Sequence, residues 1–159
     1  MDRLLSLIQH DALASRADLA AQLDTTVEDV ERRIAAFEAT GVIIGYQTII
    51  DSEKLEDQFV TAVIEVKIAP EREGGFDRMA ERIGKFREVR SCYLMSGGYD
   101  LLIFIEGKSL REVASFVSEK LSPLGGVIST ATHFRLKAYK ENGVLLAGGE
   151  KVERLAVSP

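Results

Sequence analysis

Apolar residues in the first 50 positions recur every three or four residues in three short blocks, which is the spacing of one helix face. Ser15 with Asp18, and Thr26 with Asp29, are capping signatures that mark where the second and third blocks begin. Gly41 follows the third block, at a position where glycine commonly ends a helix. We therefore predict three short helices with a tight turn between the last two, the helix-turn-helix arrangement. The predicted helices span residues 2–9, 16–23 and 27–41.

From about residue 58 the pattern changes to strand-like alternation of apolar and polar positions, interrupted by two segments of helical period. The predicted strands are residues 59–68, 89–95, 100–106 and 127–139, and the predicted helices are residues 76–86 and 110–121. The order βαββαβ is the ferredoxin-like unit, an antiparallel sheet with helices on one face. We predict an α+β protein: an N-terminal helix-turn-helix followed by a ferredoxin-like domain.

This change of pattern predicts the domain organisation. The segments are a helix-turn-helix domain at residues 1–50, a linker at 51–57, a ferredoxin-like domain at 58–140, and an extension at 141–159. The uncovered sheet face would expose Val63, Tyr93 and Phe134 or their neighbours, and pairing of two sheets in a homodimer would cover it. In the extension, residues 144–146 and 152–157 suit a hairpin that joins a neighbour's sheet, or a frayed tail.

Composition removes several classes of protein. The net charge of −5 has the wrong sign for a protein that coats nucleic acid through bulk charge. The single cysteine, Cys92, excludes an internal disulfide and a cysteine-based zinc site. We find no membrane-spanning stretch and no export signal, so we expect a cytoplasmic protein that does not enter the membrane. His10 and His133 lack a neighbouring ligand at metal spacing, so we predict no metal site and no cofactor.

Five segments, in order, resemble the leucine-responsive regulator (Lrp/AsnC) family of bacterial and archaeal transcription factors, over about residues 2–140. They are residues 15–20 (SRADLA), 30–38 with VERRI and FE, 41–46 (GVIIGY), 51–55 (DSEKL) and 96–100 (SGGYD). The resemblance implies that the helix-turn-helix binds double-stranded DNA and that a hinge strand lies near residues 44–50. It also implies a C-terminal domain that dimerises through its sheet and assembles into octamers. A small effector, commonly an amino acid, would bind between dimers.

The predicted DNA-contacting residues lie on the third helix and the turn before it. They are Thr25, Thr26, Glu28, Asp29, Arg32 and Arg33. Arg32 lies opposite the apolar stripe, where it could contact phosphate or guanine. However, Glu28 precedes Arg32 by four residues and could neutralise it, whereas the family's helix is generally polar and basic there. The alternative is a structural or sensor module with weak or lost DNA binding. We predict weak or strictly site-specific binding with a shallow salt dependence.

The predicted effector site is the glycine-rich hairpin together with the last strand. Its residues are Ser96, Gly97, Gly98, Tyr99, Asp100, Thr130 and Thr132. The glycines let a ligand approach the backbone, Tyr99 could cover it, and Asp100 could accept hydrogen bonds from an ammonium group. Alternatively, the hairpin is only a turn, in which Asp100 binds backbone N–H groups of that turn.

Catalytic function has no support in the sequence. No serine, nor Cys92, comes with an identifiable base, and no phosphate loop or dinucleotide fingerprint is present. Decarboxylases of the sirohaem pathway resemble the same two-part architecture, but the chain has no evident cluster of histidine and arginine that would face a haem. We therefore predict a regulator that is not an enzyme.

Overall fold

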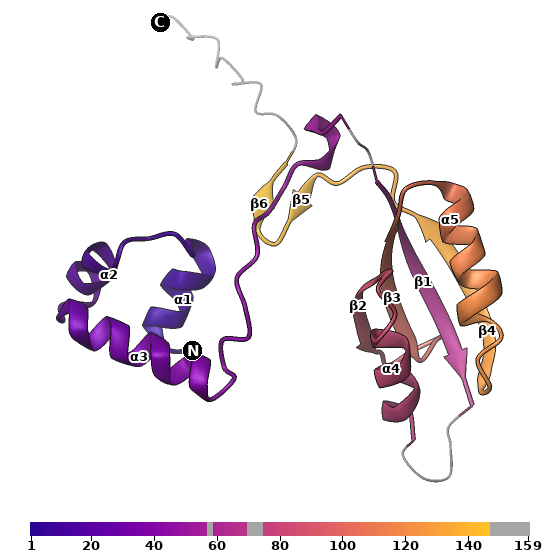
Figure 1. The fold of residues 1–159 in the computed structure, drawn as a ribbon, viewed down its shortest axis with the longest axis horizontal. Helices are drawn as coiled ribbons and strands as arrows, with labels where there is room; N and C mark the ends of the chain where they lie inside the picture. The colour runs from indigo at the N-terminus through magenta and orange to yellow at the C-terminus, as the bar shows by residue number, and fades with distance from the viewer. Residues whose placement is uncertain (57–58, 70–74, 147–159) are drawn as a thin grey trace, which may run out of the picture. The chain divides into compact units, whose positions relative to one another are not determined.

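The computed structural model describes residues 1–56, 59–69 and 75–146, and the chain divides into two compact units. The first unit is Met1–Thr48 and the second is Ile49–Pro159. Each unit buries its own cluster of apolar side chains. The first unit is built from helices, and the second is built around a sheet (Figure 1).

Three capped helices form the first unit. They are α1 (Arg3–His10), α2 (Arg16–Leu23) and α3 (Val27–Ala39). The side chains of Asp2, Ser15 and Thr26 each accept a backbone N–H from the first turn of the helix that follows. The turn between α2 and α3 passes through Asp24, whose φ of 52° is left-handed, and Gly41 follows α3 with a φ of 72°. The core of the unit consists of Leu4, Ile8, Leu19, Ala20, Val30 and Ile34. The predicted helix-turn-helix is confirmed.

The second unit is a four-stranded antiparallel sheet with helices on one face (Figure 1). Its elements are β1 (Val60–Ile68), α4 (Asp77–Gly84), β2 (Val89–Leu94), β3 (Leu101–Gly107), α5 (Leu110–Ser115), η2 (Phe116–Leu121) and β4 (Val127–Phe134). The strand order β2-β3-β1-β4 is that of the predicted ferredoxin-like unit. Met79 of α4, Val113 of α5 and Leu121 of η2 belong to the core that also buries Ile64 and Val66 of β1.

One of the predicted helices is not regular throughout. The apolar spacing after Ser109 predicted a single helix to residue 121, and the Ser109 hydroxyl does accept the N–H of Glu112 at 3.2 Å. After Ser115 the helix continues as η2, a π-helix whose hydrogen bonds span five residues rather than four. Three- and four-residue spacing cannot separate these two forms over so short a segment.

The strand register decides which side chains lie on the open face of the sheet, because residues directly opposite each other on antiparallel strands share a face. The open face carries Val63, Tyr93, Leu102, Phe104 and His133. The prediction named Phe134 or its neighbours, and the register selects the neighbour. Phe134 pairs with the buried Ala62, so its side chain lies on the helix-covered side, and its neighbour His133 takes the place on the open face.

The last strand is shorter than predicted. β4 ends at Phe134, whereas alternation predicted a strand to residue 139. Arg135 still donates its N–H to the carbonyl of Thr61 at 2.9 Å. Since β1 begins at Val60, residues 136–139 extend past the start of their partner strand, and among the described residues no other strand pairs with them.

A small hairpin follows instead. It pairs β5 (Lys140–Glu141) with β6 (Val144–Leu145) around Asn142 and Gly143, both of which have positive φ. The prediction paired residues 144–146 with residues 152–157, but residues 144–145 pair with β5 within the same chain. Residues 147–159, including 152–157, lie outside the described residues.

The segment between the two units differs from what the resemblance implies. No strand is assigned to residues 44–50, where the family pattern implies a hinge strand. The next element is a short 3₁₀ helix, η1 (Ser52–Lys54). Over residues 1–56, 59–69 and 75–146, no helix has both the length and the hydropathy that a membrane crossing requires.

Candidate DNA interface and effector site

The start of α3 is organised by two threonines. Thr26 accepts the backbone N–H of Asp29 at 3.2 Å, which is the predicted helix cap. The hydroxyl of Thr25 donates to Asp29 Oδ2 at 3.2 Å. In the protomer, both hydroxyls therefore make hydrogen bonds to Asp29 in the first turn of α3.

The basic residues of α3 are paired with carboxylates. Arg32, whose side chain is 73% exposed, binds Asp29 Oδ1 through its guanidinium. The guanidinium of Arg33 binds both carboxylate oxygens of Asp2, at 2.8 and 2.9 Å, and lies 3.6 Å from Asp29 Oδ2. Arg33 is therefore tied to the start of α1, while Arg32 projects from the exposed side of α3.

The predicted pairing of Arg32 with Glu28 is not observed. Arg32 binds Asp29 three residues before it, and the pKa of Asp29 is lowered chiefly by the hydrogen bond from Arg32. The pKa of Glu28 is lowered first by its own backbone N–H and then by the Thr26 hydroxyl. Residues three apart and residues four apart on a helix can both form an ion pair, so Asp29 and Glu28 are each within reach of Arg32. The carboxylate of Glu28 turns back onto the helix N-terminus, where free N–H groups favour an anion.

The glycine-rich hairpin is anchored to β1 by Asp100. Its carboxylate accepts the backbone N–H of Ile68 at 2.8 Å, and its own N–H donates to Val66 O at 3.0 Å. The alternative predicted that the Asp100 side chain binds N–H groups of its own turn. The N–H that it binds instead belongs to Ile68, which lies 32 residues away. Gly97 has a φ of 144°, which the absence of a side chain permits.

The predicted effector residues flank the same end of β1. Asp100 lies beside Val66 on one side, and Thr130 pairs with Val66 on the other side. Since neighbouring strands are about 4.8 Å apart, Asp100 and Thr130 are about 10 Å apart across β1. Thr132 pairs with Ile64, so both threonine side chains lie on the helix-covered side. Asp100 and Thr130 thus lie on opposite sides of β1 near its end, and Thr132 lies nearer the middle of the strand.

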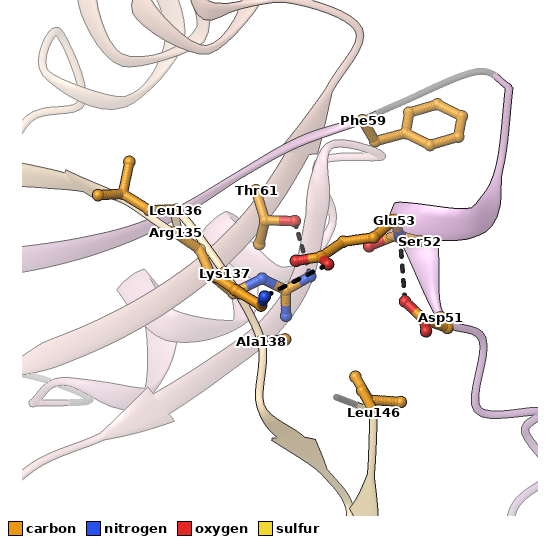
Figure 2. A pocket seen from close by; sticks show the side chains of 10 residues that line it. All are labelled: Asp51, Ser52, Glu53, Phe59, Thr61, Arg135, Leu136, Lys137, Ala138 and Leu146. Carbon is orange, nitrogen blue, oxygen red and sulfur yellow. Dashed lines mark hydrogen bonds and ion pairs between the residues drawn. The ribbon is translucent and has the colours of Figure 1, made fainter. Parts of the chain in front are cut away.

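A small cavity of about 100 Å³ lies elsewhere in the second unit and was not predicted (Figure 2). Arg135 spans it, with Nη2 donating to the Thr61 hydroxyl at 3.1 Å and Nη1 donating to Glu141 at 3.0 Å. Lys137 Nζ lies 3.9 Å from Glu53 of η1. Arg135 and Lys137 alternate along the predicted strand, but no sequence signal links them to Glu53, which is more than 80 positions away. None of the predicted effector residues lines this cavity.

The remaining candidates have ordinary structural environments. His133 Nε2 lies 3.5 Å from Glu65 Oε1 on the open sheet face. Cys92 is half-buried, and burial raises the pKa of its thiol, which disfavours the reactive thiolate. Within residues 1–56, 59–69 and 75–146, no group of three or more His, Cys, Asp or Glu side chains is placed to hold a metal ion.

The first unit is a helix-turn-helix whose last helix, α3, carries an exposed arginine, and the second unit is ferredoxin-like. This is the architecture of a two-domain transcriptional regulator. The model for the Lrp/AsnC ligand-binding domain matches residues 61–145. The uncharacterized HTH-type transcriptional regulator YugG of Bacillus subtilis is 44% identical over 98% of this chain and 95% of its own length. The chain belongs to the Lrp/AsnC family of transcriptional regulators.

Solved structures agree with this fold. Escherichia coli AsnC superposes with a TM-score of 0.67 at 19% identity, over 89% of this chain and 95% of AsnC. A transcriptional regulator of Neisseria meningitidis, solved in complex with L-methionine, has a TM-score of 0.68 at 22% identity, over 92% and 97% of the two chains. These likenesses confirm the α+β fold class. The relatives by sequence are transcriptional regulators, so the expectation of a regulator rather than an enzyme is confirmed.

Proposed function

We propose that this regulator binds double-stranded DNA site-specifically through α3 and that a small amino acid modulates the binding. The observation that carries the proposal is the helix-turn-helix of the first unit, in which α3 leaves Arg32 73% exposed opposite its buried stripe. A guanidinium there can bind phosphate or make the two-pronged contact to guanine in the major groove. Thr25 and Thr26, at the start of α3, would contact phosphate in the same complex. The protein would act in the cytoplasm, where bacterial and archaeal DNA lies.

The effector site that we propose comprises the hairpin of residues 96–100 together with Thr130 and Thr132 of β4, on the other side of β1. Gly97 and Gly98 leave the backbone open to a ligand, and Asp100 offers a carboxylate at the end of β1. Regulators of the same fold have been solved with L-methionine, one from Neisseria meningitidis and one from Mycobacterium tuberculosis. A free amino acid would supply the ammonium group that Asp100 can hold.

Assembly is the second part of the proposal. The open sheet face exposes 52% of Tyr93 beside Phe104, and the two rings make an edge contact with centroids 6.1 Å apart. A homodimer that pairs two such faces would cover these rings and give the DNA two copies of α3. Ile44, which is 95% exposed in the segment after α3, would be covered when two hinge segments pair. We further propose that dimers associate into octamers, and that the domain division at 1–50, 51–57, 58–140 and 141–159 separates these roles.

A second candidate function is favoured by the ion pairs on α3. If Asp29 and Asp2 hold both arginines permanently, the protein is a sensor module whose DNA binding is weak or lost. An electrophoretic shift assay with the DNA upstream of its own coding sequence separates the two functions. Site-specific binding at nanomolar to micromolar protein supports the regulator, and weak or no binding to both upstream and scrambled DNA supports the sensor module. Tight binding that is equal for the two DNAs would contradict both.

The effector is tested by thermal unfolding in the presence of each of the twenty amino acids. A ligand that binds the native form raises its melting temperature by an amount that grows with the logarithm of its excess over Kd. We expect one or a few amino acids to raise the melting temperature and to change the electrophoretic shift. If none of the twenty changes either measurement, the effector part of the proposal is wrong.

A further inference from the structure

Asp29 lies at the centre of a charge network on the N-terminal half of α3. Its Oδ1 binds the guanidinium of Arg32, and its Oδ2 accepts from the Thr25 hydroxyl at 3.2 Å and lies 3.6 Å from Arg33 Nη1. The Asp29 side chain is 27% exposed, while Arg32 is 73% exposed. One carboxylate thus holds the two cations and one of the hydroxyls through which α3 would contact DNA.

A carboxylate in this position occupies the groups that a DNA phosphate would use. Guanidinium binds carboxylate and phosphate with the same forked geometry, so the two compete for Arg32. A hydroxyl that donates to Asp29 is likewise engaged when a phosphate arrives. A phosphate that takes the same donor atoms, Arg32 Nη2 or the Thr25 hydroxyl, must therefore first break a contact to Asp29.

We propose that Asp29 is a specificity-determining residue, which acts by positioning Arg32 and Arg33 away from DNA phosphates. This inference rests on the proposed DNA-binding function. On a non-cognate duplex, exchange of a carboxylate for a phosphate brings little net gain, so binding is weak. At a cognate site, a two-pronged contact from Arg32 to a base adds an interaction that Asp29 cannot replace. Asp29 therefore suppresses sequence-independent binding more than site-specific binding.

A purely structural role for Asp29 is the competing explanation. Its backbone N–H binds the Thr26 hydroxyl, and a carboxylate in the first turn of a helix is favoured by the helix dipole. Loss of such a role would lower the stability of the first unit but would not tighten DNA binding. The affinity for mixed-sequence DNA and its salt dependence therefore separate the two explanations.

Asp29→Asn is the main test variant, because the amide keeps an oxygen for Thr25 and removes the charge that holds the arginines. Glu31→Gln is the matched control. It removes one negative charge from the same helix, and among the described residues Glu31 makes no ion pair or side-chain hydrogen bond. Asp29→Glu restores the charge at a spacing that still reaches both arginines.

Asp2→Ser offers an independent route to the same release. A serine keeps the helix-capping oxygen for the Leu4 N–H, which Asp2 now accepts at 2.8 Å, and removes the carboxylate from Arg33. Because Arg33 remains near Asp29 in this variant, we expect a smaller gain in DNA affinity than for Asp29→Asn.

The experiment titrates the full chain and each variant into a mixed-sequence 40-base-pair duplex and into the upstream DNA, by fluorescence anisotropy at several salt concentrations. We expect Asp29→Asn to bind mixed-sequence DNA about tenfold more tightly than Glu31→Gln. We also expect the slope of log affinity against log salt concentration to become more negative by about one to two, because each added phosphate contact releases counterions. Asp29→Glu should behave like the unchanged chain.

Four results are decisive. A gain for Asp29→Asn on mixed-sequence DNA beyond the Glu31→Gln control, larger than its gain on the upstream DNA and reversed in Asp29→Glu, supports the inference, and an equal gain on both duplexes contradicts it. If the unchanged chain binds upstream DNA and Asp29→Asn matches the control on the mixed-sequence duplex, the inference is wrong and DNA binding stands. If no form of the protein binds either duplex, the DNA-binding function itself is wrong.

Discussion

Replacement of Asp100 by alanine separates the structural and ligand-binding roles of the glycine-rich hairpin. In the folded chain, the Asp100 carboxylate accepts the N–H of Ile68 at 2.8 Å in a partly buried position. A hydrogen bond to a charged group contributes about 1.5–3 kcal/mol, and its loss leaves the N–H of Ile68 without this partner. We therefore expect Asp100→Ala to lower the free energy of unfolding of the second unit by about 2 kcal/mol.

The magnitude can be measured by urea unfolding followed by circular dichroism, at one fixed protein concentration because assembly couples to stability. For a unit of about 100 residues, 2 kcal/mol corresponds to a fall of roughly 10 °C in melting temperature. Asp100→Asn keeps an acceptor for the Ile68 N–H, so we expect it to lower the free energy of unfolding by less, about 1 kcal/mol.

The asparagine variant then tests the ligand. If Asp100 holds the ammonium group of an amino acid, Asp100→Asn loses most of the effector-induced rise in melting temperature while it keeps most of its stability. An alanine variant with an unchanged urea midpoint would refute the structural argument. A full thermal response in the asparagine variant would remove Asp100 from the effector site.

Three further predictions follow from the geometry. Thr26→Ala removes the cap that Asp29 N–H donates to, and should cost the first unit about 1 kcal/mol, measured by its thermal midpoint. The hydrogen bond from Lys120 lowers the pKa of Glu88 below its ordinary 4.5, so this pair stabilises the fold above pH 4.5, and the stabilisation is lost as the pH falls through the lowered pKa. Glu88→Gln should therefore reduce the loss of stability as the pH falls below 4.5, and an unchanged slope would contradict the assignment. Phe104→Glu places a charge on the open sheet face and should reduce the sedimenting mass to that of a protomer, while a persistent dimer would show that another surface mediates assembly.

Local signals in the sequence were sufficient for most of the fold. Side-chain caps such as Ser15 and Thr26 act within three residues, so their pattern is visible without tertiary information. Alternation along β1 likewise marks its buried face, because the period of a strand is two. The errors lie where a neighbour decides the outcome. Alternation after Phe134 continues in the sequence, but a strand ends where its partner ends.

The candidate sites depend on contacts that spacing alone does not determine. Arg32 could reach Glu28 or Asp29 equally well by helical geometry, and local hydrogen bonding at the helix start decides in favour of Asp29. The partner of Asp100 is 32 residues away on another strand, so only the sheet register reveals it. The pairing of Arg33 with Asp2 depends in the same way on how α1 packs against α3.

The number of protomers on one duplex tests the central claim, that assembly presents paired copies of α3 to DNA. Native mass spectrometry of the full chain with its upstream DNA measures this number directly. The account predicts complexes with an even number of protomers on each duplex, two at the least. A complex with a single protomer per duplex, persisting as the protein concentration rises, would contradict it.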